Sequence, residues 1–153
     1  MKTTDIIYLS KKGMKELRKA ISRLERDRQR AIIELRDLDK TDSHDSRLTR
    51  IEKLAFLDTI ESELADKRTY LDQAQLFPRR RKRDMLKVAI GSVVELIDQT
   101  GRKVVYTIVD SIEANPSDGR ISIKSPLGQS LLGKTIKDTI GLNKMQFQLV
   151  GIS

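Results

Sequence analysis

The sequence predicts an α+β protein in which an N-terminal antiparallel α-helical hairpin, a coiled coil, precedes a small domain with an antiparallel sheet and a short helix. Between residues 11 and 77 there is one glycine, Gly13, and no proline, whereas the other glycines all follow residue 90. Apolar residues recur at spacings of three and four in the first part and form short β-branched runs in the second. We therefore expect a hairpin domain at 1–77, a basic linker at 78–86 and a C-terminal domain at 87–153.

The first helix is predicted by an apolar stripe that Arg28 alone interrupts. Its members are Met14, Leu17, Ile21, Leu24, Ala31, Leu35 and Leu38. Ser10 stands just before the stripe and is a suitable N-cap, because its hydroxyl can accept a hydrogen bond from a free first-turn amide. A helix of about 28 residues would form a rod roughly 42 Å long.

The second helix is predicted by a similar stripe that ends before Pro78. Its members are Leu57, Ile60, Leu64, Leu71 and Ala74, preceded by Leu48, Ile51 and Leu54 at a spacing of three that indicates a stutter in the register. Residues 40–46 between the two helices are rich in short polar side chains that favour turns and caps. The two helices should therefore fold back on each other.

The C-terminal part alternates strand and turn signals. Apolar runs at 88–97 and 103–109 flank a turn that contains Gly101, which predicts a β-hairpin. A turn at 115–119, a strand at 120–124 and a closing strand at 145–152 follow from the same rules. Ser125 as cap and Pro126 as first residue open a short helix, for which Gly133 is a candidate stop.

Composition excludes several classes of protein. The chain of 153 residues has no cysteine, which excludes disulfides and thiolate zinc sites, and His44 is its one histidine. Aromatic residues make up 4%, too few for a platform that stacks single-stranded bases. No apolar run is long enough for a signal peptide or a membrane span, so we expect a cytoplasmic protein that does not contact the membrane.

The net charge of +8 is concentrated in one place. Residues 1–78 carry 17 basic and 15 acidic side chains, residues 84–153 carry 8 and 7, and residues 79–83 are all Arg or Lys, which sums to +2, +1 and +5. Five adjacent positive charges can bind phosphates and so predict a weak contact with DNA or RNA. A flexible charged connector is the alternative interpretation, and we favour it slightly.

The sequence from Ile121 to Lys134 resembles the signature of the bacterial transcript cleavage factors, the GreA/GreB family: a strand, then Ser-Pro, then a short Leu-rich helix that ends in Gly-Lys. The order of a hairpin of about seventy residues and a following domain is also similar, and the likeness covers nearly the whole chain. The resemblance implies an FKBP-like fold for the C-terminal domain. Prolyl isomerase activity is not expected, because only Tyr106 and Phe147 supply rings there.

The resemblance also implies a function. Family members bind RNA polymerase with the C-terminal domain and insert the hairpin into the secondary channel, where two acidic residues at its tip help to hold magnesium and a water. The polymerase then cleaves the 3′ end of backtracked RNA, so the factor stimulates an enzyme without being one and has no cofactor beyond the shared magnesium. We expect a monomer whose partners are bacterial RNA polymerase and the nascent RNA 3′ end.

The acidic places of the family tip fall on Asp42 and Asp45 within 41–46. Magnesium prefers hard oxygen ligands and keeps several waters, so carboxylates from a partner can complete its shell, and a second metal can stabilise phosphodiester hydrolysis. Asp45 stands where the family usually has Glu, and His44 replaces a basic residue. The alternative interpretation is that these aspartates only cap the following helix, which stabilises it by about 0.3 to 1 kcal/mol.

Other residues have expected roles. Ser125 and Pro126 would contact the polymerase, although Lys124 precedes them where some members carry Asp. Five basic residues near the tip would attract RNA phosphates, or would be a solvated helix face: Arg36, Lys40, Arg47, Arg50 and Lys53.

Two further functions stay open. An acid-rich tip, to which Asp37 and Asp39 contribute, is similar to that of Gre-like inhibitors, which occupy the same channel without stimulating cleavage. A basic coiled-coil protein that binds nucleic acid without a polymerase partner is the third hypothesis.

Overall fold

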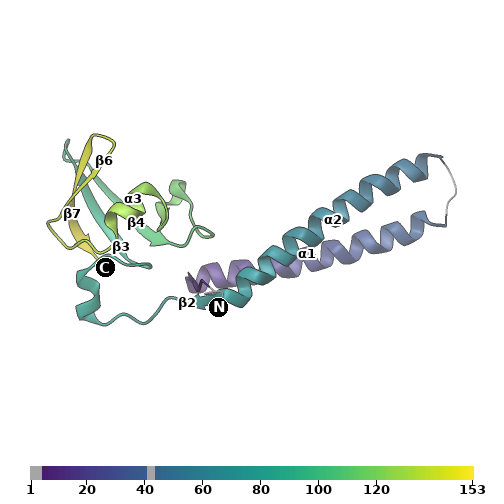
Figure 1. Cartoon of the computed structure of the whole chain (residues 1–153), viewed down its shortest axis with the longest axis horizontal. Helices are drawn as coiled ribbons and strands as arrows, with labels where there is room; N and C mark the ends of the chain where they lie inside the picture. The colour runs from purple at the N-terminus through teal and green to yellow at the C-terminus, as the bar shows by residue number, and fades with distance from the viewer. Residues whose placement is uncertain (1–4, 41–43) are drawn as a thin grey trace. The chain divides into compact units, whose positions relative to one another are not determined.

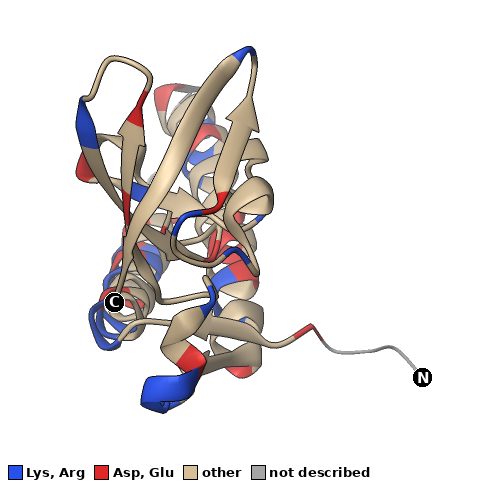
Figure 2. Cartoon of the chain, turned by 90° about the vertical axis from the view of Figure 1, so that its left-hand side faces the viewer, with Lys and Arg blue, Asp and Glu red and all other residues tan. Residues whose placement is uncertain are grey.

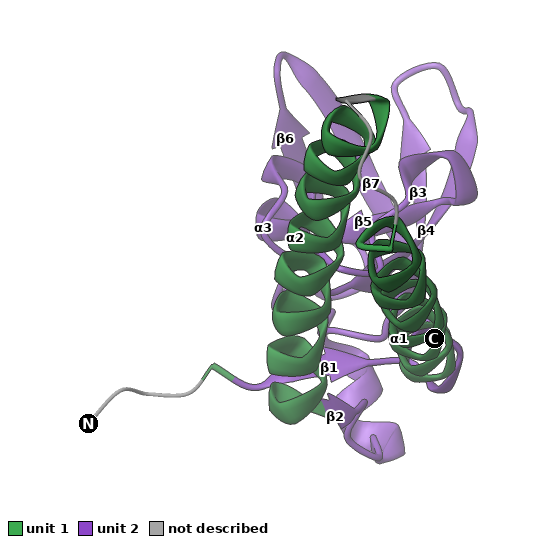
Figure 3. Ribbon diagram, turned by 90° about the vertical axis from the view of Figure 1, so that its right-hand side faces the viewer, with its two compact units in different colours: residues 1–5, 14–74 green, residues 6–13, 75–153 purple. Residues whose placement is uncertain are grey.

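The computed structural model describes residues 5–40 and 44–153, apart from the side chain of His44. The chain divides into two compact units, which Figure 3 shows in green and purple. Met14–Ala74 build the first unit, and Ile6–Gly13 together with Gln75–Ser153 build the second. The described residues contain no helix long and apolar enough to cross a membrane.

The first unit is an antiparallel pair of long helices, α1 (Lys11–Leu38) and α2 (His44–Gln73), which lie side by side in Figure 1. The 28 residues of α1 confirm the predicted first helix. Ser10 is its N-cap as predicted, because the Ser10 hydroxyl accepts a hydrogen bond of 2.9 Å from the amide of Gly13. The predicted stripes supply the buried side chains of the hairpin, which are Leu17, Ile21, Ala31, Leu35, Ile60 and Leu64.

The first turns of α2 depart from the predicted stripe. Leu48, Ile51 and Leu54 are 56%, 63% and 44% exposed. In a helix of 3.6 residues per turn, each step of three residues falls short of a full turn, so three such steps rotate a side chain by about 180°. Leu48 therefore lies on the opposite face from Leu57, and a run spaced by three alone could not stay in the seam.

Ion pairs join the two helices along the hairpin. The partners on α2 move toward its N-terminus as those on α1 move toward its C-terminus, which is the antiparallel order: Glu25 with Arg68 (2.7 Å), Arg28 with Glu61 (3.0 Å), Glu34 with Lys53, and Asp39 just beyond α1 with Arg50. Arg28, which interrupts the apolar stripe, thus pairs with the facing helix. These side chains are roughly half exposed, so each pair contributes about 1 kcal/mol or less.

The second unit contains a five-stranded sheet in the order β5-β4-β3-β7-β6. Its strands are β3 (Val93–Asp98), β4 (Lys103–Val109), β5 (Arg120–Ser122), β6 (Thr139–Leu142) and β7 (Met145–Ile152). The short strands β1 (Ile7–Leu9) and β2 (Ala74–Leu76) form a separate two-stranded sheet. The described elements confirm the predicted class of a helical hairpin followed by a sheet domain.

The core of the second unit lies between the sheet and the short helix α3 (Pro126–Leu131). Strands β3, β4, β6 and β7 each supply apolar side chains to it. The buried members are Val88, Val94, Leu96, Ile108, Leu131, Ile140 and Leu149, each at most 3% exposed.

Local turn chemistry agrees with the sequence in two places. The β3–β4 hairpin closes at Asp98, whose carbonyl accepts from the amide of Gly101 at 3.1 Å, with Gly101 at φ +82°. The Thr100 hydroxyl and the Arg102 amide donate to the Asp98 carboxylate and hold its pKa below the ordinary value of 3.8. The turn at 115–119 is confirmed as well and contains the 3-10 helix η2 (Pro116–Asp118).

Two strand predictions need correction. The strand predicted at 88–97 begins only at Val93, because the amide of Val88 donates to the carbonyl of Lys134 and the chain turns through Gly91 at φ +86°. The sheet is mixed rather than antiparallel, since β5 pairs parallel to β4 with Ile108 opposite Ile121. The connection through η2 carries the chain back before β5 begins, so β5 runs in the same direction as β4. Strand β6 was not predicted from the sequence.

The segment predicted as linker is ordered and belongs to the second unit. Residues Lys82–Leu86 form the 3-10 helix η1, and the amide of Phe77 donates to the carbonyl of Leu9 at 3.0 Å. Within 78–86, the Arg80 guanidinium donates to the Ser92 hydroxyl and, at 2.6 Å, to the Lys87 carbonyl, so hydrogen bonds hold this segment on the second unit. Its role as a linker stays a prediction.

Candidate interaction sites at the hairpin tip and the Ser125 turn

The hairpin tip carries one described member of the predicted acidic pair. Asp42 lies outside the described residues. Asp45 is exposed in the first turn of α2, where its carboxylate interacts favourably with the positive end of the helix dipole. The predicted turn at 40–46 is shorter than expected, because α2 begins at His44. The helix-capping interpretation of Asp45 thus has a structural basis, while its exposure leaves its oxygens accessible to a ligand.

Three of the five basic residues predicted around the tip form ion pairs with acidic side chains. Lys40 pairs with Asp37 at 3.1 Å, and the hairpin ion pairs described above include Arg50 and Lys53. Arg36 is exposed in the last turn of α1, where a positive charge favours the helix dipole, and Arg47 is exposed in α2. An incoming phosphate would therefore compete with carboxylates for several of these groups, and their contact with RNA stays a prediction.

The described tip offers carboxylate oxygens of the kind that Mg²⁺ prefers, and its contact with a metal ion stays a prediction. In the described part of the chain, no three His, Asp or Glu side chains gather closely enough to hold a metal. The exposed carboxylate of Asp45 offers the hard oxygen that Mg²⁺ prefers. A Mg²⁺ ion at this position would need most of its remaining ligands from water or from a second molecule.

Ser125 and Pro126 form the capped start of α3, as the sequence predicted. The Ser125 hydroxyl accepts from the amide of Gly128 at 3.1 Å and donates to the carbonyl of Ser122 at 2.7 Å. Pro126 occupies the first helical position, where its missing amide costs no hydrogen bond. Helix α3 ends at Leu131, and Gly133 follows at φ +75°, which confirms the predicted stop.

Gly128 lets α3 approach β5 closely. A Cβ atom placed on Gly128 would lie 2.1 Å from the carbonyl oxygen of Ser122, which is backbone and cannot move aside without disturbing the strand. The Ser-Pro-Leu-Gly run is therefore explained by local packing alone. A contact of Ser125 or Pro126 with a partner protein stays a prediction.

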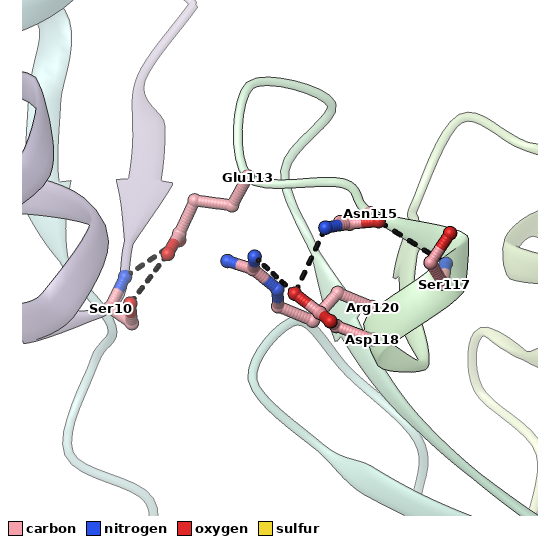
Figure 4. Close-up of polar contacts among 6 residues, drawn as sticks. All are labelled: Ser10, Glu113, Asn115, Ser117, Asp118 and Arg120. Carbon is pink, nitrogen blue, oxygen red and sulfur yellow. Dashed lines mark hydrogen bonds and ion pairs between the residues drawn. The ribbon is translucent and has the colours of Figure 1, made fainter.

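A buried acid, Glu113, was not predicted from the sequence. It is 8% exposed, and its carboxylate accepts from the amide of Ser10 at 2.9 Å and from the Ser10 hydroxyl at 2.5 Å (Figure 4). A Cβ on Gly13 would lie 2.1 Å from the Oε1 atom of Glu113. The one glycine of the helical part, which costs about 1 kcal/mol in a helix, was the available signal of such a close approach.

The described chain is thus a long helical hairpin followed by a sheet domain with one short capped helix. A sequence model described as "Transcription elongation factor, GreA/GreB, C-term" matches residues 83–152. The transcription elongation factor GreA of Shouchella clausii is 31% identical over 144 residues, which cover 89% of this chain and 87% of that protein. The chain belongs to the GreA/GreB family and is a Gre-type transcription elongation factor.

The chain is also similar to a second GreA protein and to a solved structure. The transcription elongation factor GreA of Mycoplasma pneumoniae is 31% identical over 139 residues, which cover 86% of this chain and 83% of that protein. Among solved structures, GreA factor homolog 1 (Gfh1) of Thermus thermophilus is 26% identical and covers 97% of this chain and 99% of that chain, with a TM-score of 0.45.

Proposed function

We propose that this factor binds RNA polymerase, inserts its hairpin into the secondary channel and stimulates the polymerase to cleave the 3′ end of backtracked RNA. The observation that carries the proposal is the exposed Asp45 at the end of two helices of 28 and 30 residues in a member of the GreA/GreB family. A hairpin of this length is roughly 40 Å long, enough to carry a carboxylate deep into a narrow channel.

The proposed chemistry belongs to the polymerase. Asp42 and Asp45 would supply carboxylate oxygens to a magnesium ion that the polymerase also binds, and this ion would activate water for attack on a phosphodiester. The basic residues of the tip would hold the extruded RNA by its phosphates, without reading its sequence. Ser125 and Pro126 would belong to the surface that binds the polymerase.

A cleavage assay tests this function. A stalled, backtracked polymerase with end-labelled RNA receives the protein, and the rate at which the RNA shortens is measured. We expect Asp42→Asn and Asp45→Asn to slow the stimulated cleavage by at least about 10- to 100-fold, a loss typical of disturbed metal sites. Asp66→Asn is the matched control, because it makes the same chemical change at an exposed position of α2 far along the helix from the tip.

The cleavage assay shows whether the protein stimulates the polymerase. Cleavage that is unaffected by the protein, together with aspartate variants that behave like the unmodified chain, would refute the activating role. Binding to the polymerase is measured separately, so that a variant that no longer binds is not mistaken for one that binds without activating.

An inhibitor of the same channel is the second candidate, and the tip composition favours it. Asp45 is one methylene shorter than the usual Glu, and the exposed acids Asp37 and Asp39 pair with basic neighbours. With a shorter side chain at one position, the two tip aspartates could occupy the channel without placing the magnesium ion correctly. The cleavage assay distinguishes the two candidates, because an inhibitor slows RNA synthesis and competes with an activating Gre factor.

A further inference from the structure

The strongest concentration of positive charge in the chain lies on the second unit, in residues 79–83, here named the basic segment. It precedes and enters the 3-10 helix η1 and forms the blue stretch at the lower end of Figure 2. Arg80 is half-buried, whereas its four neighbours are exposed. These four are Arg79, Arg81, Lys82 and Arg83.

Arg80 attaches the basic segment to the sheet domain. Its guanidinium donates hydrogen bonds to the hydroxyl of Ser92, to the carbonyl of Asp84 and, at 2.6 Å, to the carbonyl of Lys87. Ser92 is fully buried, and its hydroxyl also accepts from the amide of Ala89 at 3.0 Å. Arg80 is therefore a positioning residue, because its planar guanidinium ties the segment to Ser92 and to the backbone at Asp84 and Lys87.

The neighbours of Arg80 are directed toward solvent. Arg81 has extended backbone angles, φ −80° and ψ 158°, and side chains alternate in direction along an extended chain. Since Arg80 points to the domain interior, the exposure of Arg79 and Arg81 agrees with this alternation. Lys82 and Arg83 begin η1, which keeps their charges next to the other two.

Few acidic groups pair with the positive charges of the basic segment. Asp84 directly follows the basic segment in the sequence, and its carboxylate accepts from the backbone amide of Arg81 at 3.1 Å. Its ion pair with Arg83 is long, 3.9 Å, and exposed. Within residues 5–40 and 44–153, no ion pair joins an acid to Arg79, Arg81 or Lys82. The basic segment thus differs from the hairpin tip, where acids and bases alternate.

We propose that the basic segment binds the sugar-phosphate backbone of double-stranded DNA, without reading its sequence. Four exposed cations on an ordered segment can displace the counterions that surround duplex DNA, which is the main source of sequence-independent affinity. This proposal does not depend on the cleavage function, since it concerns residues of the second unit alone.

The surroundings of the basic segment favour a duplex over other polyanions. Single-stranded nucleic acids are bound by exposed aromatic rings as well as charge, but the nearby ring of Phe77 is half-buried against Gly91. Stable membrane attachment needs a long amphipathic helix, whereas η1 has five residues with Met85 and Leu86 as its exposed apolar side chains. Backbone contacts to a duplex need neither feature.

The test measures binding of the full chain to a fluorescent 30-base-pair duplex of mixed sequence between 50 and 200 mM salt. Each neutralised phosphate contributes about 0.9 to the slope of log affinity against log salt. We expect the variant Arg79→Gln, Arg81→Gln, Lys82→Gln and Arg83→Gln, made in one protein, to flatten this slope by about 3 to 4. Its affinity at 50 mM salt should fall by at least about tenfold.

The matched control removes four exposed charges from α1: Lys15→Gln, Lys19→Gln, Arg23→Gln and Arg26→Gln. Both variants have a net charge of +4, that is +8 less 4, so their difference isolates the position of the charges. We expect the control to keep most of its affinity. Arg80→Gln should lower affinity more than Arg79→Gln, although each loses one charge, because Arg80 also positions its neighbours.

Circular dichroism and thermal melting verify that every variant is folded. The proposal is overturned if the unmodified chain does not bind the duplex at 50 mM salt, or if the four substitutions in the basic segment weaken binding no more than the control does. It is also overturned if single-stranded DNA or RNA of the same length, or vesicles with anionic lipids, bind to the basic segment more tightly than the duplex does.

Discussion

The two units of this protein are stabilised in different ways. In the second unit, side chains such as Leu96, Ile108 and Leu131 are completely buried between a sheet and a helix. In the hairpin, buried residues such as Leu17 and Leu64 keep 7% and 3% exposure and lie in a single seam, with exposed ion pairs on either side. A two-helix seam can bury only one face of each helix, so charge rather than apolar contact covers the rest of it.

This difference predicts which part of the hairpin opens most readily. Near the tip, Leu48 and Ile51 face solvent, and Asp39 and Arg50 are held by an exposed ion pair. Local stability follows the number of buried apolar contacts, so the tip half should open more readily than the base half or the sheet domain.

The largest expected effect tests the two cores directly. We expect Leu131→Ala to lower the free energy of unfolding of the second unit by about 3 to 5 kcal/mol, because the rigid surroundings leave a cavity. Leu64→Ala should cost the hairpin about 2 to 3 kcal/mol, since a thin seam can partly collapse. Native-state hydrogen exchange of the slowest amides in each unit measures both values. Equal or reversed costs would show that the hairpin seam is packed as rigidly as the sheet domain.

A smaller effect tests backbone packing in the second unit. Gly128→Ala should destabilise this unit by about 1 to 3 kcal/mol, because the new methyl group would meet the carbonyl of Ser122. Gly141→Ala is the matched control, since a Cβ there meets nothing within 4 Å and the substitution should be neutral or stabilise by about 0.4 to 1 kcal/mol. Urea unfolding followed by circular dichroism gives both values, and an unchanged Gly128→Ala variant would contradict the close approach of α3 to β5.

The smallest effect concerns the ion pairs of the hairpin. A double-mutant cycle with Arg28→Ala and Glu61→Ala should give a coupling energy of about 0.2 to 1 kcal/mol at low salt, because both groups are partly exposed. In 1 M salt the Debye length falls to about 3 Å, and the coupling should largely vanish. A coupling well above 1 kcal/mol that persists in 1 M salt would mean that these pairs, rather than the apolar seam, hold the helices together.

Local rules predicted much of the fold and part of the candidate sites. The span of α1, the Ser10 cap, the strand β4 and the capped start of α3 at Ser125 each depend on residues within a few positions of one another. Asp45 was predicted in the turn at 40–46 but lies in the first turn of α2, because the short polar residues there suit a helix start as well as a turn.

Predictions from the sequence failed where the structure depends on contacts between residues far apart in the chain. The parallel pairing of β5 with β4 depends on how the intervening chain returns, and the exposure of Leu48 depends on which face of α2 meets α1. The inward position of the Arg80 side chain was not predicted, because its acceptor Ser92 lies twelve positions away.

By itself, the sequence determined the order of the parts, the length of the first helix, the caps of α1 and α3 and the concentration of positive charge at 79–83. The tertiary structure alone decided that Glu113 would accept hydrogen bonds from Ser10, 103 positions earlier, and that Arg80 would turn inward while its neighbours remain exposed. The physical reason is range: helix propensity and capping act within one or two turns of chain, whereas burial and charge pairing depend on which surfaces folding brings together.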